Sequence, residues 1–266
     1  MKLVIKLGGQ AAEDVKGRRK LARQIVKLRR AGHAVVVVHG GGKALTRTLD
    51  RLGIATEFHQ GLRVTDAATR DVALMVLAGI VNKQWVAEFA ALGQPALGIC
   101  GGDAGLVYAR KIFSQANGQK KDLGYVGRPH KIRTRVLEMA WRGGLIPVVA
   151  SLGLGPRGEF LNINADDLAA ALALALRADR LFYLTESGGV WDAQRRLLPL
   201  LRLGEIPGLI RQGIVREGMI PKLLSCARLL RQQVGEIDIL SADGSNALLQ
   251  AMEKGPHGGT RIVKNA

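Results

Sequence analysis

The sequence is poor in cysteine and in aromatic residues. Two of its 266 residues are cysteine, Cys100 and Cys226, and 4% are aromatic. Two cysteines that are far apart in the sequence exclude a disulfide framework and a metal site of the CxxC type, so we expect both thiols to be buried and unreactive. Few aromatic rings leave little surface on which bases could stack, which argues against nucleic-acid binding as the main role.

Long apolar runs are also missing, and we expect no secretory leader. No continuous apolar run reaches the roughly 20 residues that cross a bilayer, and the first residues already have the character of a strand. We therefore expect a cytoplasmic protein with no membrane partner. The hydrophobic fraction of 47% is enough to bury a full core.

Acidic residues are scarce relative to basic ones. The chain has 22 Asp and Glu against 39 Lys and Arg, a formal net charge of +17. This excess favours acidic partners, of which nucleic acid is the usual one. Because the basic residues are spread along expected helix faces, we expect solvated helices and anionic small substrates to account for most of the charge.

Short apolar segments alternate with amphipathic segments of helical length, which predicts an α/β protein with a mainly parallel sheet. Strands are expected at 2–6, 34–38, 95–99, 145–149, 180–184 and 236–240. Helices are expected at 14–31, 42–52, 66–92 with a break near Gly79, 132–142, 164–177, 204–212, 218–232 and 245–253. Hairpins or loops are expected at 104–129 and 152–162.

Two glycine-rich turns follow the first two expected strands, in Lys6-Leu7-Gly8-Gly9 and in His39-Gly40-Gly41-Gly42. Glycine lets the backbone approach an anion closely, and the N–H groups of such turns form a cradle for phosphate oxygens. Together they predict a phosphoryl site. We expect His39 to be a packed, hydrogen-bonded residue at a strand end and not a general base.

Familiar phosphate signatures do not explain these turns. A Walker A loop would need glycine at position 37 and Ser or Thr at 44, where the chain has Val37 and Ala44. The segment 153–158 matches GxGxxG in letters, but Pro156 and the extended residues after it offer no helix, so we interpret it as a hairpin turn.

Two polar segments lie further along the chain. Asn162-Ile163-Asn164-Ala165-Asp166-Asp167 precedes an alanine-rich helix, and one Asn or Asp is expected to cap it. Alternatively, Asp166 points into a cleft and holds two lysines by ionic hydrogen bonds. The second of these lysines would be Lys222, which follows Pro221 in the first turn of a helix.

Six motifs follow one another along nearly the whole chain: Lys6-Leu-Gly-Gly9, His39-Gly-Gly-Gly42, Gly61-Leu-Arg63-Val-Thr65, Val81-Asn82-Lys83, Asn162-Ile-Asn-Ala-Asp166 and Gly218-Met-Ile-Pro-Lys222. In order and spacing they resemble the amino acid kinase family. This resemblance implies a three-layer αβα sandwich with two lobes, in which residues 1–177 bind the acceptor and form the dimer, and residues 178–266 bind ATP.

The chain is most similar to family members that transfer a phosphoryl group from ATP to the side-chain carboxylate of N-acetyl-L-glutamate in arginine biosynthesis. By that resemblance Lys6 and Lys222 stabilise the transferring group and Asp166 organises both lysines. The backbone N–H groups of Gly9 and Gly41 would bind its oxygens. No general base is needed, since a carboxylate is ionised at neutral pH.

The resemblance also implies the binding residues. The acceptor would contact Gly41, Gly42, Arg63 and Asn162. ATP would contact Glu186, Ser187, Gly188, Gly189, Val190, Trp191, Ile214, Val215 and Arg216. Glu186 departs from the family, which commonly has Asp there, and Mg²⁺ would be carried mainly by the nucleotide phosphates.

Two alternatives stay open. The high positive charge would also suit a kinase of the same fold that acts on glutamate or 2-aminoadipate attached to an acidic carrier protein. A non-catalytic relative that binds nucleic acid is a further alternative, against which the joint presence of Lys6, Asp166 and Lys222 argues. By analogy we expect a homodimer that arginine does not inhibit.

Overall fold

The structure is a computed structural model that describes residues 1–8, 14–116, 119–215, 218–243, 246–253 and 258–264. The chain divides into two compact units. Unit 1 comprises Met1–Val37 and Leu172–Ala266, and unit 2 comprises Val38–Ala171. The predicted α/β fold with a mainly parallel sheet is confirmed.

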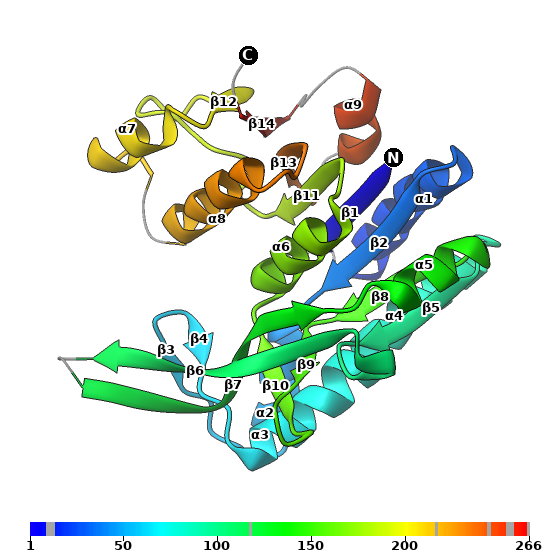
Figure 1. Cartoon of the computed structure of the whole chain (residues 1–266), viewed down its shortest axis with the longest axis vertical. Helices are drawn as coiled ribbons and strands as arrows, with labels where there is room; N and C mark the ends of the chain where they lie inside the picture. The colour runs from blue at the N-terminus through cyan, green and yellow to red at the C-terminus, as the bar shows by residue number, and fades with distance from the viewer. Residues whose placement is uncertain (9–13, 117–118, 216–217, 244–245, 254–257, 265–266) are drawn as a thin grey trace. The chain divides into compact units, whose positions relative to one another are not determined.

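Unit 1 is built on a sheet with the strand order β12-β14-β13-β11-β1-β2, of which β2 runs across the division between the units (Figure 1). β1 pairs in parallel with β11, and β11 with β13, whereas β14 is antiparallel to β13. The inner strands are apolar along their length because both faces are covered. The strands are β1 (Lys2–Leu7), β2 (Ala34–His39), β11 (Arg180–Thr185), β12 (Leu200–Arg202), β13 (Glu236–Ser241) and β14 (Gly259–Val263).

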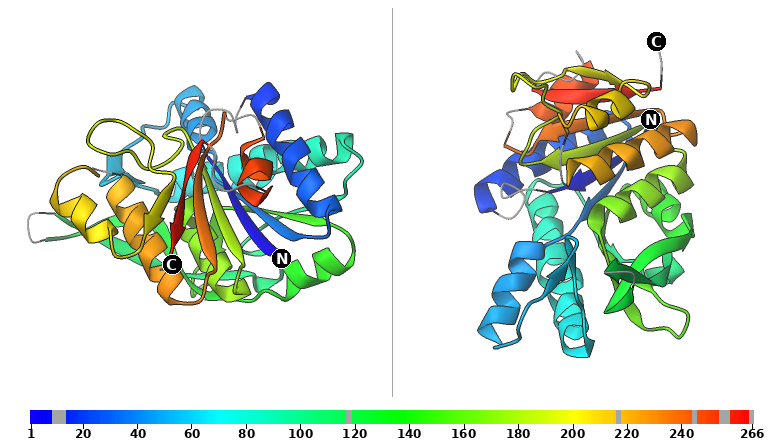
Figure 2. Two further views of the ribbon diagram at one scale, coloured as in Figure 1. Left: turned by 90° about the horizontal axis from the view of Figure 1, so that it is seen from above. Right: turned by 90° about the vertical axis from the view of Figure 1, so that its left-hand side faces the viewer.

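Helices cover both faces of the unit 1 sheet. Figure 2, left, shows α8 on one side of the strands, and α1 with α9 on the other. This is the layering of the predicted αβα sandwich. The helices are α1 (Val15–Arg30), α7 (Ile206–Arg211), α8 (Met219–Arg231) and α9 (Ala247–Glu253), while α6 (Ala165–Leu176) crosses the division between the units.

Unit 2 contains a parallel pair, β5 with β8, a closed barrel of β10-β7-β6-β9, and the short hairpin β3-β4. The barrel strands β6 and β7 form the long hairpin of Figure 1. Both segments expected to be hairpins or loops therefore belong to this barrel. The strands are β3 (Phe58–His59), β4 (Leu62–Arg63), β5 (Ala96–Cys100), β6 (Val107–Ala116), β7 (Gln119–Ile132), β8 (Ile146–Ala150), β9 (Leu152–Leu154) and β10 (Phe160–Ile163).

The expected break near Gly79 is absent. Instead α3 (Ala67–Ala73) continues into a π-helix, η2 (Leu74–Val81), and then into α4 (Asn82–Ala91). Glycine weakens a helix because its backbone loses more conformational freedom on folding than that of any other residue. Here Gly79 lies inside the widened π turns, which are rare and concentrate at functional sites. The other helical segments of unit 2 are α2 (Gly42–Arg51), η3 (Asp103–Gly105) and α5 (Arg135–Arg142).

The helical stretch 67–91 is also the one described helix whose length and apolar composition would allow it to cross a membrane, and 39% of its most apolar window is buried. The core helix of a soluble protein passes the same test.

The two units divide the chain differently from the predicted lobes, 1–177 and 178–266. Residues 1–37 belong with the C-terminal segment because β1 forms a parallel ladder with β11, from Leu3 opposite Arg180 to Lys6 opposite Tyr183. The order of the strands along the chain does not reveal this pairing, because β1 and β11 are neighbours in the sheet although they are far apart in the sequence.

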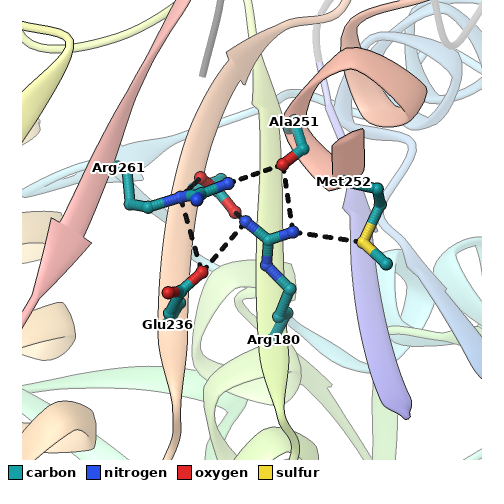
Figure 3. A network of polar contacts seen from close by, with 6 residues as sticks. Arg180, Glu236, Ala251, Met252 and Arg261 are labelled. Carbon is teal, nitrogen blue, oxygen red and sulfur yellow. Dashed lines mark hydrogen bonds and ion pairs between the residues drawn. The ribbon is translucent and has the colours of Figure 1, made fainter. Parts of the chain in front are cut away.

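A buried ionic cluster ties together three strands and one helix of unit 1 (Figure 3). Arg180 contacts Glu236 at 3.0 Å and Asp238 at 2.9 Å, and Arg261 contacts Asp238 at 2.9 Å. Both arginines also donate to the Ala251 carbonyl near the end of α9. Burial raises the pKa of Asp238 to about 7, with Arg180 opposing that rise.

Candidate active site

Both predicted catalytic lysines lie in unit 1 and have Tyr183 as a neighbour, one by strand register and one by side-chain contact. Lys6 on β1 stands opposite Tyr183 on β11, so the two side chains leave the same face of the sheet. The Nζ atom of Lys222, in the first turn of α8, lies 4.9 Å from the centre of the Tyr183 ring. The structure therefore brings Lys6 and Lys222 to one face of the unit 1 sheet.

Gly8 leaves the room that Lys6 occupies. A Cβ added to Gly8 would lie 2.6 Å from Lys6 Nζ and 2.7 Å from the Leu184 carbonyl oxygen. Any larger residue would push against both, so glycine allows the lysine to fold back over the turn. Gly9, the other predicted residue of this turn, lies outside the described residues.

The predicted nucleotide segment follows the end of β11 and is held by its own polar groups. Thr185 Oγ1 lies 3.0 Å from Ser187 Oγ and accepts from the Gly188 N–H at 3.2 Å. The φ of Gly188 is +69°, a conformation that favours glycine. Glu186 is exposed at the bend.

The second half of that segment is anchored to β14. The Val190 N–H donates to Thr260 Oγ1 at 2.8 Å, and a Cβ on Gly189 would lie 2.8 Å from the same oxygen. The Trp191 indole donates to the Ser187 carbonyl at 2.9 Å, and the side chain remains 45% exposed. Thr260 was not predicted, and its buried hydroxyl carries no sequence signal by itself.

The other predicted nucleotide residues follow α7. Ile214 is half-buried and Val215 is buried, while Arg216 lies outside the described residues.

Arg63 is the centre of the predicted acceptor site in unit 2. It is 7% exposed, and its guanidinium donates to Thr46 Oγ1 at 2.7 Å, to Thr56 Oγ1 at 3.1 Å and to the Gly42 carbonyl at 3.3 Å. The guanidinium carbon also lies 4.5 Å above the centre of the Phe58 ring. These contacts fix the position of the positive charge.

None of these partners is an anion. Among the described residues, no carboxylate lies within ion-pair distance of Arg63, although burial lowers the pKa of this group and Asp50 opposes that effect at longer range. A guanidinium stays charged in proteins. A buried cation with only neutral partners is suited to bind an anionic ligand.

The predicted residues Arg63 and Asn162 are linked through Thr65. Thr65 Oγ1 donates to the Arg63 carbonyl at 2.8 Å and accepts from Asn162 Nδ2 at 3.4 Å. Thr65 is fully buried. The structure thus brings the Arg63 and Asn162 motifs together, and Thr65 was already part of the first of them.

Gly41 and Asp166 lie at the N-terminal ends of α2 and α6. Gly41 has φ +146° and precedes α2, which starts at Gly42. The Asp166 N–H donates to Asn164 Oδ1 at 2.8 Å, so Asn164 caps the first turn of α6 as expected for this segment. The Asp166 side chain is half-buried. Its predicted role in holding the lysines stays a prediction.

Comparison with known proteins identifies the family. The family model described as the amino acid kinase family matches residues 1–241. An acetylglutamate kinase of Koribacter versatilis strain Ellin345 is 47% identical to this chain, and one of Acidobacterium capsulatum is 43% identical, each over 263 residues and 99% of both chains.

A solved structure has a similar fold. N-acetylglutamate synthase from Neisseria gonorrhoeae, complexed with coenzyme A and N-acetyl-glutamate, superposes with a TM-score of 0.86 at 27% identity. The match covers 100% of this chain and 60% of that longer chain. With the family model matching most of its length, the chain belongs to the amino acid kinase family.

Proposed function

We propose that this protein transfers the terminal phosphoryl group of ATP to the side-chain carboxylate of N-acetyl-L-glutamate, forming an acyl phosphate in arginine biosynthesis. Relatives named acetylglutamate kinase that are 47% and 43% identical over 99% of the chain support this substrate. The single structural observation that carries the proposal is Arg63, a buried guanidinium whose described partners are neutral.

In this proposal Arg63 binds a carboxylate of the acceptor. Its guanidinium is planar and donates to Thr46, Thr56 and the Gly42 carbonyl, so it presents a defined donor geometry. Asn162 contributes an amide near the same motif, and the backbone of Gly41 and Gly42 completes the acceptor site. The acceptor carboxylate is already ionised at neutral pH, so these residues have to orient it and need not deprotonate it.

Lys6 and Lys222 stabilise the phosphoryl group during transfer. In the transition state negative charge spreads over three equatorial oxygens, and ammonium groups on one face of a sheet are suited to neutralise it. The register of Lys6 opposite Tyr183 and the contact of Lys222 with the Tyr183 ring support this assignment. Asp166 organises the lysines, and the N–H groups of Gly9 and Gly41 bind phosphoryl oxygens.

ATP binds to the segment Glu186–Trp191 and to Ile214, Val215 and Arg216. The half-exposed Trp191 indole is oriented by its bond to Ser187 and offers a flat surface on which adenine can stack. Mg²⁺ arrives with the nucleotide phosphates, since the ammonium groups of unit 1 suit phosphate oxygens and not a cation. Quenching of tryptophan fluorescence by ATP, lost in Trp191→Phe, would support this placement.

We also propose a cytoplasmic homodimer. Met75 and Ile80 on η2 are more than half exposed, and large apolar side chains exposed on one helix are typical of subunit contacts. Light scattering that shows a monomer would contradict the dimer.

The activity is tested by incubating the protein with ATP, Mg²⁺ and free N-acetyl-L-glutamate and trapping the acyl phosphate with hydroxylamine. We expect the hydroxamate product. Its absence would overturn the proposed acceptor and favour an acceptor attached to a carrier protein.

The roles of the residues are tested by steady-state kinetics. Lys6→Ala and Lys222→Ala should lower kcat, whereas Arg63→Ala should mainly raise KM for the acceptor. Lys27→Ala, which removes an exposed lysine from α1, is the matched control and should behave as wild type. Wild-type turnover in both catalytic lysine variants would refute the mechanism.

A further inference from the structure

We infer that Asn82 is a positioning residue that fixes the turn Gly40–Gly42 through His39. The Val81-Asn82-Lys83 motif has no role in the binding or transfer steps proposed above. This inference rests on the proposed contribution of Gly41 to phosphoryl transfer, and it assigns to Asn82 no contact with substrate.

Asn82 joins three strands from a fully buried position. Its Nδ2 lies 2.9 Å from the Val148 carbonyl on β8, 3.1 Å from His39 Nε2 at the end of β2 and 3.3 Å from the Ile99 carbonyl on β5, so its two hydrogens are shared among three acceptors. A single amide group therefore holds the residue that precedes the glycine turn against two neighbouring strands. Buried donors satisfied in this way define one geometry, because any shift leaves a polar group unpaired.

The orientation of the amide follows from its neighbours. Lys83 Nζ donates to Asn82 Oδ1 at 3.1 Å and to the Gly98 carbonyl at 2.9 Å. An ammonium group can only donate, so the amide oxygen must face Lys83 and the amide nitrogen must face the strands. Gly98 leaves space for this arrangement, since a Cβ there would overlap Asn82 Oδ1.

His39 connects the amide to the turn. Asn82 Nδ2 is a donor, so His39 Nε2 has to accept, and the ring proton then sits on Nδ1. Nδ1 lies 2.7 Å from the carbonyl oxygen of Gly40 and donates to it. Burial lowers the pKa of His39 to about 4, with Lys83 adding to that effect, so the ring is neutral at physiological pH.

The same helical stretch also packs against the turn. At Gly41, whose φ is +146°, a Cβ would lie 2.9 Å from Leu77 Cδ2 and 3.1 Å from Val81 Cγ2. Both side chains belong to the π-helix that ends just before Asn82. The turn is therefore held by apolar contact at Gly41 and by the hydrogen-bonded series from Asn82 through His39 to Gly40.

The consequence for catalysis is preorganisation. Backbone N–H groups stabilise a transition state only when their direction is set before the reaction, and a displacement of about 1 Å can cost on the order of 100-fold in rate. Asn82 sets the direction of these donors without touching the substrate. Loss of its donor function should therefore lower kcat more than it changes the KM for ATP.

The test replaces Asn82 by aspartate, which keeps the shape and removes both donated hydrogens. We expect Asn82→Asp to lower kcat by tenfold or more while KM for ATP changes less than twofold. Gln84→Glu makes the same chemical change at an exposed position of α4 and should leave kcat unchanged. A folded Asn82→Asp variant with a kcat within twofold of wild type would overturn the inference.

A double-mutant comparison tests the route through His39. In His39→Gln the side-chain oxygen can take the place of Nε2, but the donor to Gly40 is lost, so kcat should fall by a similar factor. If the two residues act in series, the combined variant should be no slower than the slower single variant. Losses that multiply would show that the residues act independently and would contradict the inference.

Two further measurements separate the possible failures. Gly41→Ala should lower kcat. A wild-type kcat in Gly41→Ala would overturn both the role of Gly41 and this inference. A lowered kcat in Gly41→Ala together with a wild-type kcat in Asn82→Asp would overturn the inference alone. If Asn82→Asp does not fold, nitrogen NMR of the wild-type protein decides. We expect His39 protonated on Nδ1, and protonation on Nε2 would refute the hydrogen-bonded series.

Discussion

The buried His39 should make unit 2 sensitive to mild acid. Its pKa is lowered from 6.5 to about 4, first because burial disfavours the charged ring and then because Lys83 repels it. Above pH 6.5 the imidazole is neutral in both the folded and the unfolded chain. As the pH falls below 6.5 the unfolded chain binds a proton that the folded chain does not, so stability is lost until the pH reaches about 4.

The size of the effect follows from the two pKa values. At pH 5 the unfolded histidine is almost fully protonated and the folded one is mostly neutral, which corresponds to a loss of about 2 kcal/mol relative to pH 8. This is a substantial part of the stability of an ordinary domain, which is roughly 5–15 kcal/mol.

The measurement is urea unfolding at pH 8 and pH 5, followed by the fluorescence of Trp85, which is buried in unit 2. Trp141→Phe and Trp191→Phe remove the other tryptophan signals. The control is the His39→Gln variant in the same background. It lacks the histidine that titrates, so subtracting its free energy of unfolding at each pH removes the contribution of every other titratable group. We expect the stability difference between the two proteins to change by about 2 kcal/mol, in favour of His39→Gln at pH 5; a difference that is independent of pH would refute the argument.

Three further substitutions test contacts in the two units. Gly8→Ala should displace Lys6 and lower kcat on the order of 100-fold, with little change in either KM, because a misplaced catalytic group costs mainly rate. Arg63→Lys should raise the KM for the acceptor roughly 10- to 100-fold, since lysine offers no planar fork. Thr260→Val leaves the Val190 N–H unpaired and should raise the KM for ATP about fivefold or more, whereas Thr260→Ser should retain the wild-type value.

Much of the fold could be predicted because the apolar strands are short and strongly marked. Val35–Val38 and Leu181–Leu184 form continuous apolar runs, and the structure confirms a buried strand at each. Polar residues at helix starts were equally informative, as Asn164 shows by capping α6. These patterns involve residues that are close together in the chain, so a single sequence is enough to detect them.

The features that were not predicted depend on contacts between distant residues. Gly79 indicated a break, but the segment forms a π-helix whose Leu77 and Val81 lie against Gly41, a contact between distant residues that local propensity does not include. Similarly, Thr260 and Asn82 act on residues 70 and 43 positions away, so neither role is visible from spacing. The individual roles of Lys6, Lys222 and Arg63 came from the family resemblance and stay predictions.

The π-helix η2 has a consequence for engineering this protein. A residue of a π-helix turns the chain by less than the roughly 100° of an α-helical residue, so converting Leu74–Val81 to regular α-helix at unchanged length would rotate everything that follows. Asn82 would turn away from the three strands, and Trp85 and Phe89 would leave the core they now fill. Substitutions that favour regular α-helical geometry in this segment without a compensating deletion would therefore cost more stability than the irregularity itself, and designs based on this scaffold should keep the π turns.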